Sequence, residues 1–215
     1  MKYPLHGFLL CCLIVSIISC KQPKQSSNNS NNLDSIIGLG KNPYVPMDPS
    51  PMDMVFLPAD YPIRLMQLPL GTEATPPVAR IIYSRPHGKG RQIFGADSLS
   101  LCPYGKEWRL GANEATEITL FRTVNINGEN IGPGVFTMFC IPAIDSWEII
   151  FNSNTNIWGL NRDPAKDIFK VQIPVKTQSP AIEDFTMSFR DTNEGGVLLM
   201  AWDNVKAELP LVYMR

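Results

Sequence analysis

The chain has 215 residues, of which 44% are hydrophobic and 18% are charged, and its formal net charge is -1. A charge balance this close to neutral excludes the general electrostatic attraction on which nucleic-acid-binding proteins depend, and we expect no nucleic-acid partner. The length suits one domain that buries its own hydrophobic core.

Residues 1–19 have the features of a bacterial signal peptide. A basic start at Lys2 precedes an apolar run over residues 7–18. This run is much shorter than the ~20 apolar residues that a membrane-spanning helix needs. It ends in residues 17–20, whose order of two isoleucines, a serine and a cysteine resembles a lipobox. We therefore expect cleavage before Cys20 and acylation of its thiol by diacylglycerol, with palmitate among the acyl chains that hold the protein on a membrane.

The segment that follows Cys20 predicts where the anchor lies. Residues 21–24 contain no aspartate, so the usual signal for retention in the inner membrane is missing. No acidic run of the kind that directs lipoproteins to the cell surface follows either. We expect a protein anchored in the outer membrane with its domain facing the periplasm. Residues 20–42 form the tether, because its lysine, glutamine, serine and asparagine cannot bury enough apolar surface to fold.

Residues 43–77 are predicted to form a proline-rich arm. They contain nine of the chain's 19 prolines, which argues against a helix or a central strand in this stretch. The segment is nevertheless too apolar for a linker, with side chains such as Met54, Phe56 and Ile63. We expect an extended arm that packs along the domain.

Residues 78–215 are predicted to form an all-β domain, an antiparallel β-sandwich or jelly roll. Phe185, Met187 and Phe189 alternate with polar residues, which is typical of a strand with one buried face. No helical pattern exceeds a few turns, and many short strands at this spacing favour a sandwich. We expect strands at residues 78–84, 118–126, 134–141, 147–151, 168–175, 185–189, 197–202 and 205–212.

The histidines and cysteines argue against a metal or other cofactor. His87 is the single histidine after residue 19, and no Cys-x-x-Cys spacing occurs, so we expect no metal site. A mechanism with histidine as the base is equally unsupported. Cys102 and Cys140 are the cysteines that could pair once the others are removed or acylated. The sequence is compatible both with a disulfide between them and with two buried free thiols.

Two polar segments hold the candidate ligand-binding residues. In residues 83–91, Arg85, Lys89 and Arg91 could converge on an anion, because guanidinium groups match carboxylate and phosphate oxygens. They could equally be charges on an exposed turn. Residues 103–116 add further polar and aromatic side chains. The candidate set is Tyr83, Arg85, Lys89, Arg91, Tyr104, Trp108, Arg109, Asn113 and Glu114.

These two segments resemble the bacterial domain-of-unknown-function family numbered 2911, over residues 50–211. The resemblance implies an exported, often lipidated protein with a β-rich domain, and it supplies no activity. The residues that carry it most clearly are Tyr83, Arg85, Pro86, Lys89, Gly90, Arg91, Phe94, Gly95, Tyr104, Gly105, Trp108, Arg109, Gly111, Ala112, Asn113, Glu114 and Thr116.

Three functions remain open on the sequence alone. The first, which we favour, is a non-enzymatic module that binds an anionic glycan, a peptide or an envelope protein. The second is a carbohydrate-active hydrolase or lyase that uses Glu107 and Glu114 as paired carboxylates. The third is a purely structural envelope component in which Arg109 and Glu114 form a buried pair. We assign no catalytic residue. Of the tryptophans, we expect Trp147 and Trp202 in the core and leave Trp108 and Trp158 open.

Overall fold

The computed structural model describes residues 50–214. The predicted signal peptide, the lipidation site at Cys20 and the tether lie outside the described residues. Within residues 50–214, no helix is long and apolar enough to cross a membrane.

Nine strands form one hydrogen-bonded sheet in which every neighbouring pair is antiparallel. A small parallel pair, β3 (Phe94–Gly95) and β4 (Cys102–Pro103), lies beside it. The order of the large sheet is β1 (Met52–Leu57), β2 (Ala79–Ser84), β5 (Glu117–Leu120), β8 (Gly134–Pro142), β9 (Ser146–Asn152), β10 (Asp167–Thr192), β11 (Gly195–Tyr213), β6 (Val124–Ile126) and β7 (Glu129–Ile131).

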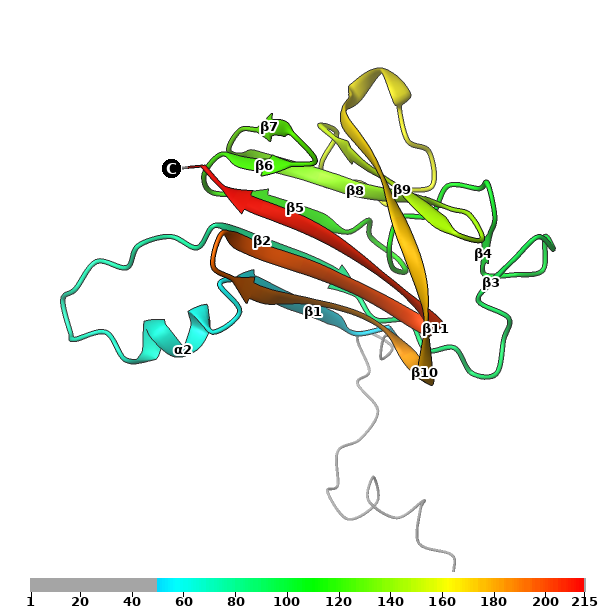
Figure 1. The fold of residues 1–215 in the computed structure, drawn as a ribbon, viewed down its shortest axis with the longest axis horizontal. Coiled ribbons are helices and arrows are strands. Elements are labelled where there is room, and N and C mark those ends of the chain that lie inside the picture. The colour runs from blue at the N-terminus through cyan, green and yellow to red at the C-terminus, as the bar shows by residue number, and fades with distance from the viewer. Residues whose placement is uncertain (1–49, 215) are drawn as a thin grey trace, which may run out of the picture. The chain divides into compact units, whose positions relative to one another are not determined.

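The sheet folds over into two layers because β10 and β11 both bend (Figure 1). Residues 167–174 of β10 pair with β9, whereas residues 175–192 pair with β11 through two register shifts. The start and the end of β11 lie side by side, since a Cβ atom on Gly195 would lie 1.9 Å from the carbonyl oxygen of Leu211. The fold is therefore an antiparallel β-sandwich, as predicted.

The two layers enclose an aromatic core. Phe185, Met187 and Phe189 are buried on one face of β10, which confirms the alternation seen in the sequence. Trp147 and Trp202 are also buried, as expected, and Trp108 packs on both at ring distances of 5.9 and 5.8 Å. Aromatic pairs of this kind add about 0.5 to 1.5 kcal/mol each beyond the burial of their area.

A tyrosine hydroxyl joins the two layers directly. Tyr83 on β2 has its hydroxyl against the backbone of Met187 on β10, accepting from the amide nitrogen at 3.0 Å and donating to the carbonyl oxygen at 3.2 Å. Desolvation by burial raises the pKa of Tyr83 to about 12. The hydroxyl therefore stays protonated at neutral pH and can donate and accept at once.

The proline-rich segment contains a strand and a short helix. Residues 52–57 form β1, an edge strand that pairs with β2. The argument from proline against a helix was wrong at α2 (Tyr61–Met66), because Pro62 lies in the first turn, where its missing N–H has no intrahelical partner to lose. No residue of α2 is buried.

The predicted strand at residues 118–126 is also wrong as one element. The structure divides it into β5, which pairs with β2 in one layer, and β6, which pairs with β11 in the other. In contrast, the predicted strands at residues 197–202 and 205–212 belong to the single bent strand β11.

Candidate functional site

The loop after β2 is held against β10. The amide of Phe185 donates to the carbonyl oxygen of Pro86 at 3.0 Å, and the amide of Gly88 donates to that of Glu183 at 2.8 Å. The His87 Nδ1 atom is hydrogen-bonded to the carboxylate of Asp184. These contacts fix residues 86–88 at the end of the sandwich, and His87 is occupied as a structural partner of β10.

Arg91 closes this loop with two of its three nitrogens. Its Nε donates to the carbonyl oxygen of Gly88 at 2.9 Å, and its Nη2 donates to that of His87 at 2.6 Å. Its Nη1 makes no hydrogen bond with the residues that the structure describes. The guanidinium is thus held in position by the loop and keeps one donor group for another molecule.

The segment of residues 103–116 is fixed to β8 and to the end of β2. Trp108 and Cys140 exchange two backbone hydrogen bonds of 2.8 and 2.7 Å, and the indole Nε1 of Trp108 donates to the carbonyl oxygen of Gly111 at 3.1 Å. A Cβ atom on Gly111 would lie 3.2 Å from the carbonyl oxygen of Ser84. Glycine at this position therefore lets the two polar segments approach closely.

Arg109 contacts the loop that follows β9. Its Nη1 donates to the carbonyl oxygen of Trp158 at 3.0 Å, and its guanidinium lies 5.7 Å from the centre of the Trp158 ring, within the range of a cation–π contact. Burial lowers the pKa of Arg109, and the carboxylate of Glu114 opposes this shift. Because the ordinary pKa of arginine exceeds 12, the side chain stays charged.

Arg91 and Arg109 line the same cavity, which we call the two-loop pocket. Its volume is about 360 Å³. Both predicted segments contribute to it, and so do Leu160 and Trp202, which were not among the candidate residues. The lining residues are Ser50, Pro86, Arg91, Leu101, Cys102, Glu107, Trp108, Arg109, Gly111, Ala112, Gly159, Leu160 and Trp202.

The remaining candidate residues lie elsewhere. Tyr83 is in the core, and Tyr104 is partly buried and packs against the core. Arg85 forms an ion pair of 3.3 Å with Asp53. Other candidates outside the lining of the two-loop pocket are Lys89, whose side chain is exposed, Asn113, which adopts a left-handed backbone conformation, and Glu114, which borders a separate hollow beside Trp158.

The geometry does not support paired catalytic carboxylates. Glu107 lines the two-loop pocket, but its Oε2 lies 2.5 Å from the Nε of Arg162, which neutralises its charge. Glu114 is exposed and borders the other hollow. Among the described residues, no ion pair joins Arg109 to Glu114, which also contradicts the buried pair expected for a purely structural role.

Cys102 and Cys140 are buried free thiols. Burial raises the pKa of both thiols above their ordinary value. Both are therefore protonated at neutral pH. Cys102 lines the two-loop pocket, but as a protonated thiol it is a weak nucleophile.

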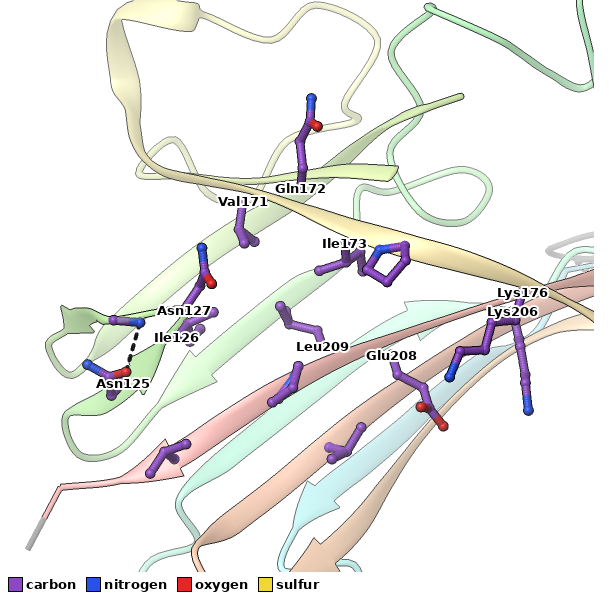
Figure 2. Close-up of a pocket in the computed structure, with 15 residues that line it drawn as sticks. Asn125, Ile126, Asn127, Val171, Gln172, Ile173, Lys176, Lys206, Glu208 and Leu209 are labelled. Carbon is purple, nitrogen blue, oxygen red and sulfur yellow. Dashed lines mark hydrogen bonds between the residues drawn. The ribbon is translucent and has the colours of Figure 1, made fainter. Parts of the chain in front are cut away.

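A second and larger cavity, of about 580 Å³, lies where β10 and β11 diverge (Figure 2). We call it the wedge cavity. Sequence reasoning missed it, because its residues come from distant segments that read as ordinary strands. They are Asn125, Ile126, Asn127, Gly128, Val171, Gln172, Ile173, Pro174, Lys176, Val197, Lys206, Glu208, Leu209, Pro210 and Val212.

Comparison with known proteins identifies one family. The family model described as "Protein of unknown function (DUF2911)" matches residues 73–211. No curated protein and no solved structure matches the chain. The matched range contains both polar segments and every residue that lines the wedge cavity except Val212.

Proposed function

The chain belongs to the family of proteins of unknown function numbered 2911, and we propose that it is a non-enzymatic binding module of the bacterial envelope. The ligand is an anionic glycan fragment held in the two-loop pocket. One observation carries the proposal: Arg91 and Arg109, from two separate polar segments, line one cavity together with Trp108.

The chemistry of the pocket favours a sugar that carries a carboxylate. The Nη1 group of Arg91 has no hydrogen-bond partner within residues 50–214. The guanidinium of Arg109 is partly desolvated, which strengthens its hydrogen bonds to an anion. Trp108 and Trp202 add apolar atoms to the wall of the pocket, although their rings pack mainly in the core and only 8% and 2% of these residues are exposed. The volume of about 360 Å³ lies at the small end of ligand sites, which suits one or two sugar rings.

The proposed location follows from the start of the chain. The lipobox-like residues 17–20 support acylation of Cys20. Residues 20–42 would then act as a tether. It would connect the acylated Cys20, anchored in the outer membrane, to a domain that faces the periplasm. A domain held in this way meets envelope glycans at high local concentration. Replacing Cys20 with serine should release the protein from membranes without changing its fold, and retention on the membrane would contradict the anchor.

A matched pair of sugars tests the proposed ligand. N-acetylmuramate and N-acetylglucosamine differ in a lactyl carboxylate, so calorimetry should show that the protein binds the first at least tenfold more tightly, since one charge-assisted contact provides about 1.5 to 3 kcal/mol. Arg109→Gln should remove most of this preference. Arg190→Gln, at an exposed position of β10, is the control. Equal binding of both sugars would contradict the proposal.

A further inference from the structure

The wedge cavity forms where two paired strands separate. β10 and β11 are paired at Val175 and Ala207. The part of β10 that precedes Val175 pairs with β9. The part of β11 that follows Ala207 pairs with β6 at its end. The two strands therefore diverge from a common end, and the gap between them is the cavity of about 580 Å³.

The apolar walls of this cavity are aliphatic, and Asn125, Asn127 and Gln172 add polar groups to its lining. Figure 2 shows Val171 and Ile173 extending from β10 toward Leu209 on β11 and Ile126 on β6. None of its lining residues is aromatic. A flexible alkyl chain fits such walls better than a planar ring, because it can follow an irregular aliphatic surface without needing a flat partner.

Two lysines lie at the end of the cavity where the strands meet. Lys176 and Lys206 are direct cross-strand partners, and both line the cavity. Like charges directly opposite on paired strands are destabilising. Neither lysine forms an ion pair with any residue in the described part of the chain.

Glu208 leaves a single positive charge at this end. It lines the same cavity, and Figure 2 shows it beside Lys206. Two ammonium groups and one carboxylate give a net charge of +1, which is complementary to one negative charge. The cavity therefore combines aliphatic walls with a place for a monoanion.

We infer that the wedge cavity binds an unesterified medium-chain alkyl carboxylate. The carboxylate contacts Lys176 and Lys206 on the outer face of the sheet. The alkyl chain passes through the gap between the strands to Val171, Ile173 and Leu209, which are buried on the inner face. This site is independent of the glycan pocket, since the two cavities share no lining residue. Binding of the anion also removes the repulsion between the two lysines, so the ligand stabilises the folded protein.

Calorimetry with decanoate and hexanoate, below the concentrations at which they form micelles, tests this inference on the whole protein. Each fully buried methylene contributes about fourfold to affinity, so decanoate should bind at least tenfold more tightly than hexanoate. The double variant Lys176→Met and Lys206→Met keeps the aliphatic stems and should weaken decanoate binding about tenfold. Lys170→Met is the control, since Lys170 lies on β10 outside the cavity and pairs with Asp167.

Four results would overturn the inference: no decanoate binding, equal affinity for both acids, unchanged affinity in the double variant, or a dimer that decanoate dissociates. The last would show that a second copy of the chain occupies the cavity. Arg109→Gln should leave decanoate binding unchanged, and the double lysine variant should leave N-acetylmuramate binding unchanged. Failure of this site and failure of the glycan pocket are therefore distinguishable.

Discussion

The two-loop pocket and the wedge cavity differ in how the fold builds them. The pocket has indole and guanidinium groups that are fixed by hydrogen bonds from loops, whereas the wedge cavity has aliphatic walls formed by strands that diverge. Loops can hold a few polar groups in a fixed arrangement. Strands that separate at the edge of a sandwich instead expose apolar side chains of the core. The first arrangement suits recognition of polar groups, and the second suits recognition of apolar shape.

The largest expected effect concerns the wall of the two-loop pocket, which is also part of the core. Trp108→Ala should lower the free energy of unfolding by about 3 to 5 kcal/mol, because it opens a cavity in the aromatic cluster. Trp158→Ala should cost less than about 1 kcal/mol, since 51% of this side chain is exposed. Urea unfolding measures both. A loss below about 1 kcal/mol for Trp108→Ala would contradict the role of this wall in the core.

The wedge cavity depends on the close approach of the two ends of β11. Gly195→Ala places a Cβ atom 1.9 Å from the backbone oxygen of Leu211, so the strand must shift, and we expect a loss of about 2 to 3 kcal/mol. The affinity of Gly195→Ala for decanoate should also fall, because the shifted strand changes the shape of the wedge cavity. Gly132→Ala is the matched variant, because its Cβ atom meets nothing within 4 Å. Thermal unfolding of the two variants gives the comparison, and similar melting temperatures would contradict it.

Tyr83 connects the layers that both cavities need. Tyr83→Phe should cost about 1 to 2 kcal/mol, because the buried amide of Met187 loses its acceptor. The folded-state pKa of about 12 lies above the ordinary value of 10. The stabilisation is therefore complete below pH 10 and is lost as the pH rises from 10 through 12. Urea unfolding at pH 9 and pH 12 should show a smaller fall in the phenylalanine variant. An equal fall would assign the alkaline loss to other groups.

The smallest expected effect concerns Glu107 at the two-loop pocket. Glu107→Gln removes a negative charge from the cavity, and N-acetylmuramate affinity should rise about two- to threefold, since a partly exposed charge changes binding by under 1 kcal/mol. Stability should change by a similarly small amount, because the ion pair with Arg162 is partly exposed on the glutamate side. Calorimetry measures the change. Weaker binding in this variant would mean that Glu107 contacts the ligand directly.

The sequence predicted the architecture where local pattern and tertiary packing agree. The alternation of Phe185, Met187 and Phe189 indicated the buried face of β10, and Trp147 and Trp202 are in the core as expected. It failed at residues 118–126, because the break between β5 and β6 follows from a change of layer and not from any proline or glycine within the segment.

The candidate site was partly predictable for a related reason. Arg91, Trp108 and Arg109 stand in two dense polar segments, so residue type alone drew attention to them. Nothing in the sequence placed Arg85 beside Asp53 or gave Glu107 the partner Arg162, because these pairings join distant segments. The wedge cavity was invisible for the same reason. Lys176 and Lys206 become neighbours only through the register of β10 and β11.

The bend of β10 also has a consequence for how the protein folds. Because one strand supplies pairing partners to both layers, neither layer is complete until residues 167–192 are in place. The contacts between the two layers therefore join distant parts of the chain, which is typical of slow folding with high contact order. Unfolding should be cooperative, with both layers lost in a single transition. The sandwich therefore cannot be completed during synthesis until residues 167–192 have been made.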